Sequence, residues 1–130
     1  MRGLRIKDKA PRGYLACDLR DFFEILGASA SGLRWLVVGD VWATGERSQE
    51  LESLANSGKH VSTDKLKELA EAVTQVIDGE FAGYRLGDEA PWVIVRAIDS
   101  AYFELMCGDE AILENVRKRF ADVSACEDPH

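Results

Sequence analysis

Residues 62–78 read STDKLKELAEAVTQVID. Apolar residues recur in this stretch at steps of three and four, which places them on one face of a helix: Leu66, Leu69, Ala70, Val73, Val76 and Ile77. Ser62 or Thr63 can cap the start of the helix, and Gly79 suits a left-handed cap at its end. The spacing therefore predicts one amphipathic helix from about Thr63 to Asp78.

Residues 92–107 read WVIVRAIDSAYFELMC, with β-branched and aromatic residues on either side of a turn at residues 99–101. This pattern predicts a β-hairpin. If Arg96 lies opposite Glu104, one face of the hairpin holds only apolar side chains: Val93, Val95, Ala97, Phe103, Leu105 and Cys107. A register shifted by one residue would place the Arg96 guanidinium on that apolar face, where an unpaired charge is costly.

The rest of the chain adds shorter elements. Capped helices are predicted after Asp18 and after Asp109, and a further short helix within residues 46–56. Strands are predicted over residues 33–42 and 81–86. Because several strands follow one another late in the chain, we expect an α+β two-layer sandwich. Its sheet would be mostly antiparallel, with about four strands and with helices mainly on one face.

The length of 130 residues predicts a single domain, residues 1–130. The net charge of −7 is uneven, because residues 1–12 carry +4 and the rest of the chain carries −11. Residues 1–12 are expected to form a flexible basic arm, in which Leu4 and Ile6 can make a short edge strand. Residues 122–130 are expected to be a flexible tail. The acidic body should repel nucleic acid and anionic membranes.

Motifs for chemistry are missing from the sequence. It contains no P-loop, no G-x-G-x-x-G and no zinc-ligand spacing, so no catalytic residue, metal ligand or cofactor is predicted. Six carboxylates lie near predicted strand or helix ends: Asp40, Asp78, Glu80, Asp88, Glu89 and Asp99. Acid–base catalysis would need two of them to converge in a cleft. Cys17 precedes a predicted helix and is a candidate nucleophile, although a small buried side chain is the ordinary interpretation.

The expected location follows from the cysteines and the hydropathy pattern. No apolar run reaches the length of a membrane span, and no apolar stretch follows the basic N-terminus as in a signal peptide. The three cysteines are widely spaced and show no C-x-x-C pattern. This spacing favours reduced thiols in a cytoplasm over a disulfide framework.

Trp35 and Trp42 have opposite parity in one predicted strand, so their side chains should face opposite ways. The commoner arrangement buries both beneath helices and loops. The alternative places one in the core and the other on the opposite sheet face, under loops or at an interface. Because aromatic residues beside carboxylates are common in protein recognition, Asp40 and Trp42 are the predicted partner-binding residues.

In its small size, its acidic α+β body and its lack of a catalytic motif, the chain is similar in general character to bacterial toxin-neutralising (immunity) proteins. This resemblance of composition implies a non-enzymatic, cytoplasmic protein-binding or regulatory domain. The acidic surface would steer it to a basic partner, such as a toxin nuclease. Two alternatives stay open. One is a small-molecule-binding domain or enzyme with a pocket between sheet and helices, and the other is a homodimeric structural module.

Overall fold

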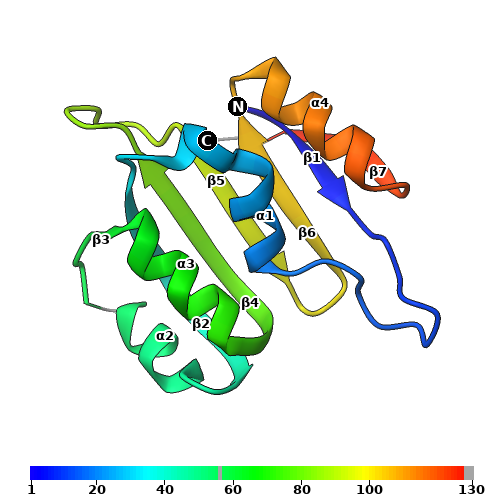
Figure 1. Ribbon diagram of the computed structural model, residues 1–130, viewed down its shortest axis with the longest axis horizontal. Coiled ribbons are helices and arrows are strands. Elements are labelled where there is room, and N and C mark those ends of the chain that lie inside the picture. Colours follow the sequence, from blue (N-terminus) through cyan, green and yellow to red (C-terminus); the bar gives the residue numbers. More distant parts are fainter. Residues whose placement is uncertain (56, 128–130) are drawn as a thin grey trace.

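The computed structural model describes residues 1–55 and 57–127, and this part of the chain forms one antiparallel sheet of seven strands with four α-helices (Figure 1). The order across the sheet is β3, β2, β4, β5, β6, β1, β7. The strands are β1 (Arg2–Ile6), β2 (Arg34–Gly45), β3 (Val61–Ser62), β4 (Val73–Tyr84), β5 (Val93–Ile98), β6 (Tyr102–Cys107) and β7 (Val123–Glu127). The helices are α1 (Leu19–Leu26), the 3-10 helix η1 (Gly27–Ala30), α2 (Ser48–Leu54), α3 (Thr63–Ala72) and α4 (Glu110–Arg119).

The predicted two-layer sandwich on a sheet of about four strands is therefore wrong, although the chain is α+β. The sheet is nearly twice as large because β3 and β7 come from segments in which no strand was expected, and β1 comes from a segment in which only a short edge strand was considered. In the described residues, no helix is both long enough and apolar enough to cross a membrane.

The predicted helix from Thr63 to Asp78 is wrong in its second half. Ser62 Oγ accepts a hydrogen bond from the Lys65 amide and caps α3 as expected, but the helix ends at Ala72 and Val73 begins β4. The β2–β4 ladder shifts register between its pairs with Gln75 and Val73. This bulge turns both Val73 and Val76 toward the core, so a strand reproduces the three-residue spacing of a helix.

The hairpin prediction is confirmed. Arg96 pairs with Glu104 and Ile98 with Tyr102, and the six predicted apolar side chains of the hairpin are buried. Asp99 and Ser100 have φ values of 50° and 58°, and the Ala101 amide donates to the Ile98 carbonyl oxygen at 2.8 Å. Positive φ at both central positions is the geometry of a type I′ turn, which matches the twist of paired strands.

The core lies between one face of the sheet and the helices. Figure 1 shows α1, α3 and α4 in front of the sheet, and the apolar side chains of these helices pack on Trp35, Phe81, Val95 and their strand neighbours. The helix cap predicted at Asp18 is confirmed, and it is a capping box: the Asp18 side chain accepts from the helix, and Asp21 accepts from the Asp18 amide. The indole Nε1 of Trp35 donates to Thr63 Oγ1 at 2.9 Å, which gives this buried polar group a partner.

The two chain ends meet in the sheet. Residues 1–12 were expected to form a flexible arm, but Arg2–Ile6 is β1, an interior strand between β6 and β7, with Leu4 and Ile6 buried. Residues 122–130 were expected to be a tail, and Val123–Glu127 instead forms β7 at the sheet edge. Residues 128–130 lie outside the described part of the chain.

Candidate functional site

The sheet face opposite the helices carries a row of paired charges. Glu80 of β4 lies opposite Arg96 of β5, which lies opposite Glu104 of β6. Glu104 in turn lies opposite Arg5 of β1, whose Nε and Nη2 are 3.0 and 2.8 Å from Glu104 Oε2. We call these four residues the charge row. Their signs alternate, so each charge is balanced by its neighbours and the row stabilises the sheet itself.

An apolar row runs beside the charge row on the same face. It consists of residues in direct cross-strand register: Leu36, Ala82, Ile94, Met106, Gly3 and Cys126. Met106 is 1% exposed, and its thioether lies over Gly3, where a side chain would collide with it. The part of this face around Met106 and Gly3 is therefore closely packed.

The same sheet face carries Trp42 on β2, a residue that is 56% exposed. Its neighbours Val41 and Ala43 pack against the core, so the indole points away from the helices. Trp42 lies opposite Asp78 of β4, and Asp78 Oδ1 accepts a hydrogen bond from the Asp99 amide at 2.7 Å. Asp40 is exposed two residues earlier in β2.

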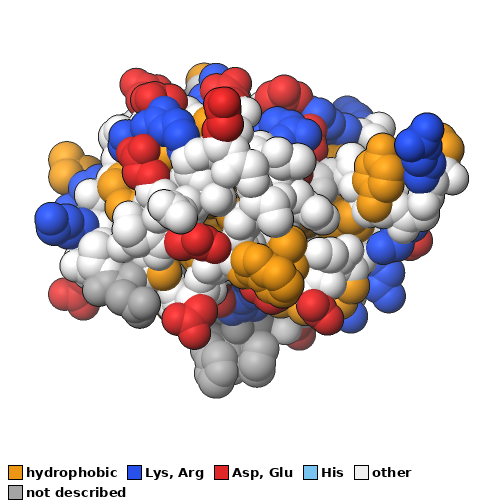
Figure 2. Space-filling view, turned by 90° about the horizontal axis from the view of Figure 1, so that it is seen from below, with side chains coloured by type: hydrophobic (Ala, Val, Ile, Leu, Met, Phe, Trp, Pro, Cys, Tyr) orange, Lys and Arg blue, Asp and Glu red, His pale blue; other side chains and the backbone are white. Residues whose placement is uncertain are grey.

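We call this group the Trp42 corner; its members are Val38, Asp40, Trp42, Asp78 and Asp99. Val38 is 38% exposed on the same sheet face. Figure 2 looks at the end of the molecule that carries the β5–β6 turn, and shows hydrophobic side chains near the middle of that surface with acidic side chains on either side. Lys and Arg side chains gather at the right, where Figure 1 places the loop after β1.

The structure separates the two tryptophans as the alternative prediction required. Trp35 is fully buried, while Trp42 is exposed beside the predicted partner residue Asp40. Sequence reasoning missed that Asp78 and Asp99 join this corner, because Asp78 was assigned to the end of a helix. The β-branched run Val73, Thr74, Val76 and Ile77 was the signal that could have placed Asp78 in a strand.

The thiol of Cys17, the candidate nucleophile, is buried and unreactive. Burial, reinforced by the charges of Asp21 and Asp18, raises the pKa of its thiol to about 12. A thiol with this pKa stays protonated at neutral pH and is a poor nucleophile. Cys107 is buried too, and burial raises its pKa. In the described residues no three His, Cys, Asp or Glu side chains gather as metal ligands would.

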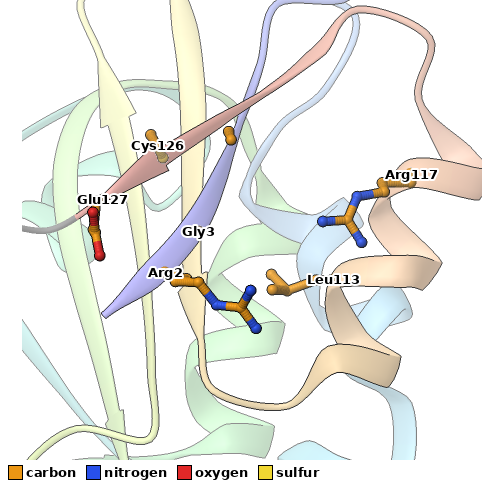
Figure 3. A pocket seen from close by; sticks show the side chains of 7 residues that line it. Arg2, Gly3, Leu113, Arg117, Cys126 and Glu127 are labelled. Carbon is orange, nitrogen blue, oxygen red and sulfur yellow. The ribbon is translucent and has the colours of Figure 1, made fainter.

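A cavity of about 350 Å³ lies between α4 and the strands β1 and β7. Figure 3 shows Arg2, Leu113 and Arg117 pointing toward one another at this cavity. The two guanidinium groups bind the same carboxylate, since Arg2 Nη2 is 3.1 Å from Glu110 Oε2 and Arg117 Nη1 is 2.9 Å from Glu110 Oε1. An anionic ligand would have to displace Glu110 from both arginines.

A second cavity of about 290 Å³ lies beside the start of α3, and a third of about 320 Å³ lies beside the start of α1.

The chain matches no protein-family model, no curated protein and no solved structure.

Proposed function

We propose that the chain is a cytoplasmic protein-binding domain that recognises a basic protein surface through the Trp42 corner. The observation that carries this proposal is an indole 56% exposed on a sheet face, with Asp78 directly opposite it. Tryptophan is among the residues most enriched at the anchor positions of protein interfaces. The role of a bacterial toxin-neutralising protein would fit such a surface, as the resemblance in size and charge implies.

The chemistry of the corner favours a cationic partner. An indole face attracts an ammonium or guanidinium group with about 0.5–1 kcal/mol at an exposed site, and more when water is excluded. Asp78 lies opposite Trp42 across the β2–β4 pair, Asp40 is exposed two residues before Trp42, and the amide of the exposed Asp99 is bonded to Asp78. The net charge of −7 adds a long-range attraction that guides a basic partner during approach.

The two arginines of the charge row are already bound within that row. Arg5 and Arg96 are bound by Glu104 and Glu80 within the charge row, so they do not offset the acidic corner. The free thiols Cys17, Cys107 and Cys126 support a reducing compartment.

A direct test titrates the isotope-labelled protein with a short Arg–Gly peptide, and with a Glu–Gly peptide for comparison. The Arg–Gly peptide should shift the indole N–H resonance of Trp42 in a saturable way. The indole N–H of Trp35 should stay in place, because it is buried and bonded to Thr63. Binding should weaken as salt rises, since the Debye length is about 10 Å at 0.1 M.

Two variants with the same change in net charge distinguish a direct contact at the Trp42 corner from a general effect of charge on binding. Asp78→Asn keeps an oxygen that can accept from the Asp99 amide, while Asp64→Asn makes the same charge change on α3, on the helix side of the sheet. Asp78→Asn and Trp42→Ala should weaken binding more than Asp64→Asn does. Equal losses for Asp78→Asn and Asp64→Asn, or no loss for Trp42→Ala, would contradict the proposal.

A further inference from the structure

The cavity of about 320 Å³ lies where the segment between β1 and α1 meets the start of β4. Asp18 and Arg20 line it from the start of α1, Thr74 and Gln75 line it from β4, and Tyr14 lies in the connecting segment. Tyr14 is 62% exposed at this surface, although it is a large aromatic side chain. The volume is at the lower end of the range of small-molecule pockets, roughly 300–1,000 Å³.

Asp18 has an oxygen without a hydrogen bond at this cavity. Its side chain is 7% exposed, and its Oδ1 accepts from the amides of Leu19 at 2.8 Å and Val76 at 3.1 Å. Its Oδ2 is buried and accepts no hydrogen bond. Arg20 Nη1 lies 3.7 Å from Oδ2, on a side chain that is 45% exposed. An ionised oxygen buried without a donor is costly, and such atoms are rare in folded proteins.

Of the carboxylate oxygens of Asp18 and Asp21 at the cavity, Asp18 Oδ2 is the one that accepts no hydrogen bond. Both oxygens of Asp21 already accept a hydrogen bond, Oδ2 from the Asp18 amide and Oδ1 from Arg119, both at 2.8 Å. Cys17 stays protonated and contributes an apolar wall. Burial raises the pKa of Asp18, while the hydrogen bonds from the Leu19 and Val76 amides lower it, so the site is short of a strong donor.

We propose that this cavity binds a small organic cation with N–H donors, a primary ammonium or guanidinium compound, and that Asp18 Oδ2 accepts its hydrogen bond. The cation would take the place of the Arg20 guanidinium, which is too far from Oδ2 to donate a hydrogen bond and can swing into solvent. Thr74, Gln75 and Tyr14 supply uncharged polar groups for the rest of the molecule. The site uses no residue of the Trp42 corner and is independent of the function proposed above.

The test uses butylammonium chloride as the probe and follows the amide resonances of Leu19 and Val76, which report on Asp18 directly. Butylammonium should shift both amides in a saturable way. Tetramethylammonium chloride has the same charge but no N–H donor, and 1-butanol has a similar chain without charge, so neither should reproduce the shift. Equal shifts with tetramethylammonium, or no saturable shift with butylammonium, would overturn the proposal. Water would then be the hydrogen-bond donor to Asp18 Oδ2.

Two substitutions should change the affinity for butylammonium in opposite directions. Asp18→Asn keeps Oδ1 as the acceptor for both amides and replaces Oδ2 by a donor, so butylammonium should bind about tenfold more weakly or worse. Arg20→Gln removes the competing cation at an exposed position, so butylammonium should bind more tightly. If Asp18→Asn fails to fold, Arg20→Gln still decides the question, because a role in folding alone would not tighten binding. Unchanged or weaker binding in Arg20→Gln contradicts the proposal.

Discussion

Asp18 Oδ1 accepts hydrogen bonds from two backbone amides, Leu19 in the first turn of α1 and Val76 in β4. One carboxylate oxygen therefore caps a helix and holds the bulged part of a strand 58 residues further along the chain. This contact fixes α1 over the sheet at the point where β4 bends away from regular pairing with β2.

Asp18→Ala should lower the free energy of unfolding by about 2–4 kcal/mol, because it removes a helix cap and leaves a second amide without a partner. Asp109→Ala is the matched control. Asp109 caps α4 from a less buried position through a bond to Ala111, and its loss should cost about 1 kcal/mol. Urea unfolding of both variants measures the difference, and equal costs would mean that the bond to Val76 adds nothing.

The stability of the parent protein relative to Asp18→Asn should fall as pH rises. Burial raises the pKa of Asp18 in the folded state, so the folded protein holds this proton more tightly than the unfolded chain. The stabilising contribution is complete below the unfolded pKa of about 3.9 and is lost as pH rises through the higher folded value. Asparagine does not titrate, so the difference between the two unfolding free energies isolates Asp18. If the unfolding free energy of the parent protein instead rises relative to that of Asp18→Asn as pH rises, the predicted direction is wrong.

Gly45→Ala should destabilise the β2–β4 bulge by about 1–3 kcal/mol. Gly45 has φ near +94°, and an added Cβ would lie 2.5 Å from the Thr74 backbone nitrogen. Gly108→Ala adds the same methyl group where nothing lies within 4 Å and φ is not positive, so its effect should be within about 1 kcal/mol. Thermal unfolding of the two variants provides the comparison.

Glu104→Ala should cost about 1–3 kcal/mol, because it removes the carboxylate that binds Arg5, while Arg96 keeps its ion pair with Glu80. Glu110 also binds two arginines, but its side chain is 56% exposed, and Glu110→Ala should cost about 1 kcal/mol or less. Chemical denaturation of both variants tests whether the burial of the carboxylate determines the loss in unfolding free energy. Similar losses would show that the charge row is as well solvated as the surface.

Local patterns in the sequence predicted local structure well. The register of the β5–β6 hairpin followed from one pair, Arg96 and Glu104, because a single turn joins the two strands and only one register keeps the charge off the apolar face. The capping box at Asp18 likewise depends on residues within one helical turn.

The sequence failed where tertiary contacts decide the conformation. Val73 and Val76 are three residues apart in both a helix and this bulged strand, and only pairing with β2 distinguishes the two. Once the segment was assigned to a helix, Asp78 could not be placed opposite Trp42. Leu4 and Ile6 alternate as a strand should, but the partners that make β1 an interior strand lie far away in the sequence.

The position of β1 has a consequence for how the protein is made. Leu4 pairs with Leu105 on one side and with Ala125 on the other, so β1 is synthesised long before either of its neighbours in the sheet. Until β6 and β7 are synthesised, Leu4 and Ile6 stay exposed on a strand with two open edges, which other chains can pair with. Pairing of β1 must therefore wait until β6 and β7 have been translated, and chaperone demand during synthesis should be concentrated at β1.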